Sequence, residues 1–161
     1  MSDKVKLCLW FDGDAEDAAS FYVSLLPDSR IDAVNRSPAD YPAGKAGDVL
    51  TVEFTLAGRN YVGLNGGAGS PFTQALSLQV ECEDQAEVDR IWDAMVANRG
   101  EPVACSWIKD RWGLSWQITP RALTKMIASP DRAAAARAMQ AMMTMVKIDL
   151  PTLENAFAGE S

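Results

Sequence analysis

Lys109-Asp-Arg-Trp-Gly-Leu-Ser-Trp-Gln-Ile-Thr-Pro120 combines a turn signal with one of the clearest strand patterns in the chain. Asp110 and Gly113 occupy the first and fourth positions of a predicted type I turn, where Asp and Gly are favoured. Residues 114–119 then alternate between apolar and polar side chains, which predicts a strand with one buried face. On this alternation Ser115 and Gln117 share the polar face with Thr119.

An alternating strand also begins a unit that the sequence contains twice. Residues 76–82 alternate, and Asp84 with Glu87 then forms the capping pattern of a helix start. The apolar positions of this second helix follow those of an earlier helix at a constant offset of 70 residues (18 to 88, 21 to 91, 22 to 92). Asp14 and Asp17 occupy the matching positions at the start of the earlier helix, where Asp14 is predicted to be the cap. Because hairpin-forming strands follow both helices, the order β-α-β-β-β occurs twice, which indicates duplication.

We therefore expect one α+β domain over residues 1–161, with a first βαβββ module at 4–65, a second at 74–119 and a helical extension at 120–161. The Gly-rich segment 66–71 separates the modules. One helix covers one face of each sheet. Two such modules side by side would form a curved mixed sheet with an open, concave face, which is the default place for a ligand.

Residues 5–11 are predicted to form a strand buried on both faces, with further strands at 29–36, 49–56, 60–65 and 102–109, and Gly100 is predicted to cap the second helix. In the extension we expect short helices at 122–127 and 149–157. A longer helix would begin at Ser129-Pro130 and run to Val146, with methionines along one face. That helix would pack on the sheet or on a second chain, or would form an adaptable Met-rich binding surface.

Charge and composition exclude several classes of function. Of the 161 residues, 22 are acidic and 15 basic, and this net charge of −7 argues against nucleic acid or an anionic membrane as partner. No apolar stretch is long enough for a membrane span, and residues 1–4 lack the apolar core of a signal peptide, so we expect a cytoplasmic protein. The chain has no histidine, which removes the commonest metal ligand and general base. Cys8, Cys82 and Cys105 are predicted to be buried, reduced thiols.

The chain resembles the PhnB-like family, also described as 3-demethylubiquinone-9 3-methyltransferase-like, of the vicinal oxygen chelate superfamily of glyoxalases, bleomycin-resistance proteins and dioxygenases. Segments 10–22, 80–90 and 107–120 carry the resemblance, together with Leu64-Asn-Gly-Gly67 and Met145-Val-Lys-Ile-Asp149. Ser106 stands where this family tends to have Gly, and Ala68 where it tends to have Pro. The resemblance implies the fold of two βαβββ modules and a pocket for a small molecule.

Superfamily enzymes hold a divalent metal with His and Glu side chains, and the resemblance places Leu7, Asn65, Ser77 and Gln117 at approximately these positions. None is a histidine or a carboxylate, so we expect neither a metal site nor a cofactor. The methyltransferase description would require a Gly-rich turn that leads into a helix. Residues 65–69 are Gly-rich, but Ser70-Pro71 and a predicted strand follow them. We interpret these glycines as a loop or a pocket rim.

Nine side chains are predicted to face the open surface or its rim and to contact a ligand: Leu7, Glu53, Tyr61, Asn65, Ser77, Gln79, Lys109, Ser115 and Gln117. Simpler interpretations exist for some of them. Asn65 and Gln117 could bond each other or the backbone, and Lys109 could form an exposed ion pair with Asp110. No nucleophile has a histidine base, so no catalytic residue is assigned, although Glu53 could serve as a carboxylate base.

The positions of the five tryptophans can also be predicted. Trp10, Trp92 and Trp116 are expected in the core beneath the helices. Trp107 and Trp112 are expected to form an apolar wall or an interface.

The leading hypothesis is a homodimeric PhnB-like protein that binds a small organic molecule in a metal-free cup. An enzyme acting on such a molecule, as a lyase, isomerase or methyltransferase, is the second hypothesis. The third is an interaction module whose Met-rich extension mediates assembly. The identity of the ligand does not follow from the sequence.

Overall fold

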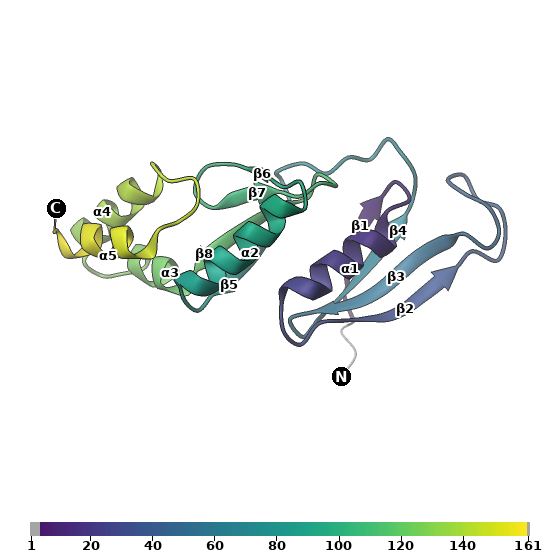
Figure 1. Cartoon of the computed structure of the whole chain (residues 1–161), viewed down its shortest axis with the longest axis horizontal. Helices are drawn as coiled ribbons and strands as arrows, with labels where there is room; N and C mark the ends of the chain where they lie inside the picture. Colours follow the sequence, from purple (N-terminus) through teal and green to yellow (C-terminus); the bar gives the residue numbers. More distant parts are fainter. Residues whose placement is uncertain (1–3, 161) are drawn as a thin grey trace. The chain divides into compact units, whose positions relative to one another are not determined.

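The computed structural model describes residues 4–160, which form two compact units that meet in the chain at Phe72 and Thr73 (Figure 1). Each unit contains a strand, a helix and three strands in that order, which confirms the predicted doubled βαβββ pattern. The second unit continues into three further helices. No helix within the described residues is both long and apolar enough to cross a bilayer.

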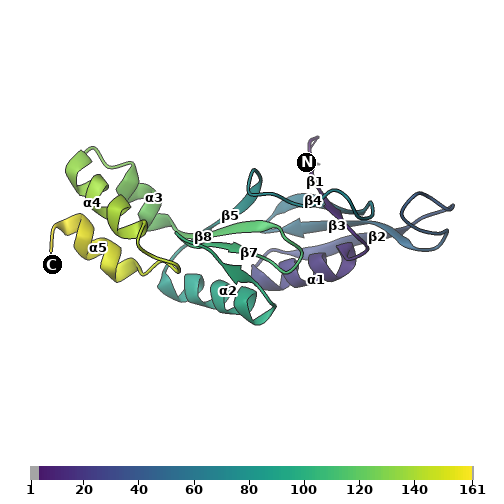
Figure 2. The same ribbon diagram turned by 90° about the horizontal axis from the view of Figure 1, so that it is seen from above.

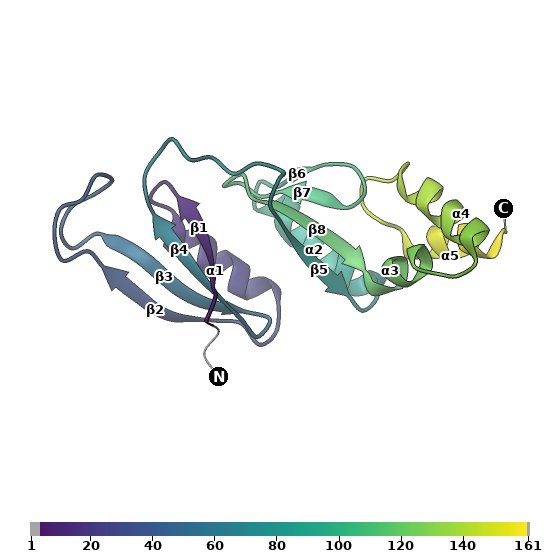
Figure 3. The same ribbon diagram turned by 180° about the vertical axis from the view of Figure 1, so that it is seen from behind.

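The first unit is a four-stranded mixed sheet with one helix. Its elements are β1 (Leu7–Phe11), α1 (Ala15–Leu25), β2 (Arg30–Arg36), β3 (Val49–Leu56) and β4 (Arg59–Asn65). The strand order is β1-β4-β3-β2, with β1 parallel to β4 and the other pairs antiparallel (Figure 3). Helix α1 covers one face, where its buried Tyr22 packs beside Phe54 of β3.

The second unit repeats this arrangement and adds the extension. Its elements are β5 (Ser77–Cys82), α2 (Gln85–Ala97), β6 (Glu101–Pro102), β7 (Trp107–Lys109), β8 (Ser115–Pro120), α3 (Arg121–Ile127), α4 (Arg132–Met142) and α5 (Leu150–Ala158). The strand order is β5-β8-β7-β6, with β5 parallel to β8. Helix α2 covers one face of this sheet (Figure 2), with Ile91 and Trp92 buried on the helix and Trp116 buried on β8.

The start of α2 has the predicted capping geometry, whereas the start of α1 does not. The Asp84 carboxylate accepts a hydrogen bond from the Glu87 N–H at 2.9 Å, and the Glu87 carboxylate accepts one from the Glu83 N–H at 2.8 Å. Asp14 makes no capping bond with its side chain, so that prediction was wrong. The amide oxygen of Asn65 accepts from the Ala15 N–H instead, at 2.9 Å. A residue 50 positions later in the chain therefore replaces the local cap.

The end of α2 differs from the prediction by one residue. Arg99, and not Gly100, adopts the left-handed conformation, with φ of 66°. The Arg99 N–H donates to the Val96 carbonyl at 3.1 Å and the Gly100 N–H donates to the Met95 carbonyl at 2.8 Å, the paired bonds of a Schellman motif. Gly100 is required for another reason, because a Cβ there would lie 2.6 Å from the Met95 carbonyl oxygen.

Strand β1 is covered on one face only, contrary to the prediction. Leu9 and Phe11 are buried beneath α1, whereas Cys8 is exposed and Trp10 is 38% exposed on the opposite face. The prediction of a buried Cys8 thiol and of a core Trp10 was therefore wrong. The Trp10 indole N–H instead donates to the Gly67 carbonyl at 2.8 Å, which holds the loop after β4. The apolar side chains of residues 7–11 suggested burial on both faces, but α1 covers only one face of this strand.

The other two cysteines lie in the second unit. Cys82 is buried as predicted, and burial together with the nearby Glu87 carboxylate raises its pKa to about 12. Cys105 is partly exposed, so the prediction of a buried thiol was wrong for it.

The turn before β8 is confirmed, but Asp110 is not on the surface. The Gly113 N–H donates to the Asp110 carbonyl at 2.9 Å, and Asp110 is only 3% exposed. Its carboxylate accepts from the Trp112 and Leu114 N–H groups and from the Trp116 indole. The predicted exposed ion pair with Lys109 was wrong, because Asp110 organises the turn from inside and Lys109 pairs with Glu101 at 3.7 Å.

The C-terminal helices pack around an apolar cluster of their own, formed by Leu123, Met126, Ala138, Ile148 and Leu153. Helix α4 begins after Asp131, whose carboxylate accepts from the Ala134 N–H at 3.0 Å, and not at Ser129. It ends at Met142 instead of continuing to Val146. Residues 145–148 leave the helix because their backbone bonds to the loop at 105–106, including the Ile148 N–H to the Ser106 hydroxyl at 2.8 Å.

Candidate functional site

Polar residues line the face of the second sheet that lies opposite α2. The strand register places Ser77 beside Ser115, Gln79 beside Gln117 and Glu81 beside Thr119. Trp107 and Lys109 of β7 pair with Gln117 and Ser115 on the same face. Because side chains alternate along a strand, all five predicted site residues of this module point away from α2: Ser77, Gln79, Lys109, Ser115 and Gln117.

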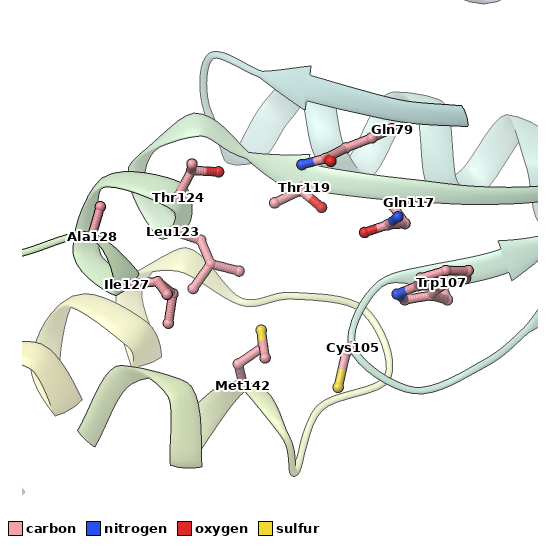
Figure 4. A pocket seen from close by; sticks show the side chains of 10 residues that line it. All are labelled: Gln79, Cys105, Trp107, Gln117, Thr119, Leu123, Thr124, Ile127, Ala128 and Met142. Carbon is pink, nitrogen blue, oxygen red and sulfur yellow. The ribbon is translucent and has the colours of Figure 1, made fainter. Parts of the chain in front are cut away.

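A pocket of about 410 Å³ lies between one end of this face and the extension (Figure 4). The sheet and the adjoining loop contribute Gln79, Cys105, Trp107, Gln117 and Thr119. The extension contributes Leu123, Thr124 and Ile127 of α3, Ala128 directly after α3, and Met142 at the end of α4. Figure 4 shows Trp107 at one end of the pocket and the α3 side chains at the other. The extension therefore supplies half of the lining.

Several polar groups of the lining have no protein partner. The Gln117 Nε2 donates to the Ser77 hydroxyl at 2.9 Å, which leaves the Gln117 amide oxygen available. Within residues 4–160, no protein group bonds the amide of Gln79 or the hydroxyls of Thr119 and Thr124. No buried side-chain nitrogen or oxygen of the described chain lacks a partner, so these free groups are accessible from the pocket. They are available to orient a bound molecule.

The lining carries no permanent charge. It contains no Asp, Glu, Lys or Arg, and the Cys105 thiol is its ionisable group. Arg121, at the start of α3, is engaged by two carboxylates, with 3.5 Å to Glu81 and 3.1 Å to Glu83. The pocket therefore presents neutral polar groups and apolar walls.

Residues 145–150, which we call the strap, connect α4 to α5 and bind the C-terminal extension to α2. Gln85 of α2 donates to the Ile148 carbonyl at 3.0 Å and accepts from the Leu150 N–H at 2.7 Å. Lys147 pairs with Asp89 at 2.8 Å. This hydrogen bond from Lys147, with a second from Gln85, lowers the pKa of the Asp89 carboxyl, and the bond to Asp89 raises the pKa of Lys147. The sequence had marked Met145-Val-Lys-Ile-Asp149 as a signature without revealing this role.

In the first unit only one of the four predicted residues lies on the open face. Glu53 does so, with the Lys6 ammonium 3.2 Å from its carboxylate and the Asn35 amide 3.5 Å away. The register places Leu7 beside Tyr61 and Phe11 beside Asn65, and Phe11 is buried on the face that α1 covers. Leu7, Tyr61 and Asn65 therefore point toward the helix side, and their predicted position in an open cup was wrong.

The two polar residues among these three have structural partners. Tyr61 stacks on Phe54 with ring centroids 5.3 Å apart, and burial raises the pKa of its hydroxyl. Asn65 is 5% exposed and also donates to the Val49 carbonyl at 2.9 Å. The geometry therefore supports the simpler interpretation of Asn65, in which its side chain bonds the backbone.

Sequence reasoning missed most of the pocket lining from the extension. Thr119 could have been found, since it shares the alternation of Gln117. Leu123, Thr124, Ile127 and Ala128 carried no signal beyond a helical pattern. Met142 was noted only within a Met-rich face.

The metal site of the superfamily does not fit this chain. The matched positions hold an aliphatic side chain, two carboxamides and a hydroxyl: Leu7, Asn65, Ser77 and Gln117. Transition metals require imidazole, thiolate or carboxylate ligands for tight binding. In the described part of the chain, no group of three or more His, Cys, Asp or Glu side chains is placed to hold a metal ion.

The sequence also matches a known family model. The model described as 3-demethylubiquinone-9 3-methyltransferase matches residues 3–119. The chain belongs to this family. This family member has the doubled βαβββ fold that the sequence predicted. The family match ends at residue 119, so the pocket residues of α3 and α4 lie beyond it.

Solved structures agree with this assignment. The PhnB protein from Bacillus cereus is 33% identical, with a TM-score of 0.63, and the match covers 71% of this chain and 97% of that one. A protein from Pseudomonas aeruginosa is 18% identical, with a TM-score of 0.57, 71% coverage of this chain and 95% of its own, and supports the fold alone. A search of curated proteins found no match.

Proposed function

We propose that this family member binds a small organic molecule in the pocket between the open face of the β5-β8-β7 sheet and the C-terminal helices. The observation that carries the proposal is a cavity of about 410 Å³ with apolar walls and uncommitted amide and hydroxyl groups. Small-molecule sites typically enclose about 300–1,000 Å³ and combine apolar lining with a few convergent polar groups. Both properties occur together here.

We propose binding ahead of methyl transfer, the activity in the family's name. The Gly-rich residues after β4 run through a loop into β5, and no helix N-terminus follows them to receive the carboxylate or ribose of a methyl donor. The pocket lining also lacks histidine, carboxylate and lysine side chains that could move a proton. These features support a binding protein over the enzymatic alternative.

The proposal is tested by filling the pocket from within. Thr124 lines the pocket and is exposed on α3, whereas its neighbour Lys125 is exposed but is not part of the lining. Fragments would be screened against the full chain by ligand-observed NMR, and each hit repeated on Thr124→Trp and Lys125→Trp. We expect the hits to lose binding to Thr124→Trp and to keep it with Lys125→Trp. Hits whose binding is unchanged by Thr124→Trp, or a screen with no hits, would overturn the proposal.

A further inference from the structure

We infer that the pocket selects an uncharged aromatic compound that carries a carboxamide, or an equivalent neighbouring donor and acceptor. This inference rests on the proposed binding function and adds a ligand class to it. Three independent properties of the lining lead to it: its charge, its hydrogen-bonding groups and its apolar walls.

The charge of the lining excludes ionic ligands. Placing a carboxylate or ammonium in a partly enclosed site costs several kcal/mol unless an opposite charge or several hydrogen bonds compensate it. No lining residue carries a permanent charge, and the Arg121 guanidinium is held by Glu81 and Glu83. A net charge of −7 further disfavours anions. A neutral molecule avoids this penalty.

The free polar groups match a carboxamide. Gln117 donates one of its two amide N–H groups to Ser77, and its amide oxygen faces the pocket as an acceptor for a donor from the ligand (Figure 4). Gln79 is its register partner on the parallel strand β5, at the roughly 4.8 Å spacing of adjacent strands. Its free amide can donate to a ligand carbonyl. A ligand amide presents one N–H to Gln117 and one C=O to Gln79 at the same time.

The remaining walls match an aromatic ring. The Trp107 indole closes one end of the pocket, and Leu123, Ile127 and Met142 line the other end and one side (Figure 4). Aromatic rings pack favourably against indole and against thioether sulfur. A flat ring therefore gains contact on several sides while its amide reaches the strands.

A matched pair of compounds tests the inference without altering the protein. 1-Naphthamide and 1-naphthoate share one ring system and differ in charge and in the presence of an N–H donor. Affinities for the full chain would be measured by isothermal titration calorimetry at neutral pH. We expect 1-naphthamide to bind at least tenfold more tightly than 1-naphthoate. Equal affinities, or tighter binding of the acid, would overturn the inference.

Glutamine variants test the role of the strand amides. We expect Gln117→Leu to weaken 1-naphthamide binding at least fivefold, because an aliphatic side chain cannot accept its N–H. Gln140 is exposed on α4 and does not line the pocket, so Gln140→Leu should bind as the wild type does. A wild-type affinity in Gln117→Leu, with its fold verified by circular dichroism, would overturn the inference.

The two proposals fail in distinguishable ways. If other fragments bind and are blocked by Thr124→Trp while 1-naphthamide does not bind, the ligand class is wrong and the pocket remains a binding site. If no fragment responds to Thr124→Trp, the proposed function fails, and the ligand class fails with it.

Discussion

At the scale of single residues, Asn65 shows how one side chain can connect distant parts of a module. It accepts from the first N–H of α1 and donates to the Val49 carbonyl at the start of β3, and it is 5% exposed. The helix cannot rely on Asp14, which makes no capping bond. The position that the superfamily uses for a metal ligand is here occupied by a structural amide.

Replacing Asn65 with Ala should destabilise the protein by about 3 kcal/mol, because the change removes the cap of the buried Ala15 N–H and the bond to the partly buried Val49 carbonyl. Equilibrium urea unfolding monitored by circular dichroism measures this change. Asn155 is exposed on α5, and Asn155→Ala is the control, expected within about 0.5 kcal/mol of the wild type. Equal stabilities of the two variants would contradict the role given to Asn65.

At the scale of elements, the end of α2 separates two roles that a single glycine usually combines. Arg99 is exposed and left-handed, and Gly100 accommodates the close Met95 carbonyl. Conformational strain is therefore stored at residue 99 and steric restriction at residue 100.

Arg99→Gly should stabilise the chain by about 0.5–1 kcal/mol, because glycine adopts the left-handed conformation without the strain of a side chain. Gly100→Ala should cost about 2 kcal/mol, because its Cβ would overlap the Met95 carbonyl. Thermal and urea unfolding measure both. Arg99→Ala is the control for loss of the side chain and should give no gain. A gain in Arg99→Ala equal to that in Arg99→Gly would show that strain is not the cause.

The strap is the element that joins the extension to α2, and its ion pair gives it a defined pH dependence. Asp89 has a lowered pKa in the folded protein, so the stability it contributes is present above its ordinary value of 3.8 and is lost as pH falls through the folded value. Lys147 has a raised pKa, so its contribution is present below 10.5 and is lost as pH rises through the folded value.

We expect amide hydrogen exchange at Ile148 and Leu150 to lose protection as the pH falls below 3.8 and through the lowered pKa of Asp89, relative to core amides such as Ile118. Asp89→Asn should already reduce this protection at neutral pH and should remove the acid dependence. NMR exchange rates, corrected for the intrinsic effect of pH, provide the measurement. An acid response that persists unchanged in Asp89→Asn would assign it to another group.

At the scale of the whole molecule, the chain is divided into two compact units joined through the Gly-rich segment after β4. Gly69 lies in this segment with φ of 104°, and a Cβ there would meet no atom within 4 Å. Gly113 has equally open surroundings, but it lies in the turn that Asp110 organises. The two glycines therefore have equally open surroundings but should differ in their tolerance to insertion.

Inserting Gly-Ser-Gly-Ser after Gly69 should change the unfolding free energy by less than about 0.6 kcal/mol, because lengthening a flexible loop costs little. The same insertion after Gly113 should be strongly destabilising, since it separates Asp110 from the Leu114 N–H and the Trp116 indole. Urea unfolding of both variants measures the contrast. Similar losses in the two variants would show that the segment after β4 is not a tolerant connection.

The amino-acid sequence alone determined the doubled βαβββ order, the family, and the side of the second sheet on which Ser77, Gln79, Ser115 and Gln117 lie. These follow from local periodicity, because a strand alternates at every second residue and a helix repeats every 3.6 residues. The capping of α2 by Asp84 was predictable for the same reason, since both partners lie within one turn.

The tertiary structure decided which residues complete the pocket and which only support the fold. Asn65 was predicted to face the cup, but the register of β4 against β1 places its side chain on the α1 side of the sheet. Leu123, Thr124 and Met142 reach the sheet because the strap bonds to Ser106 and Gln85, at separations of 42 residues or more. Contacts of that range leave no local periodicity in a sequence, so they become visible only when the chain is folded.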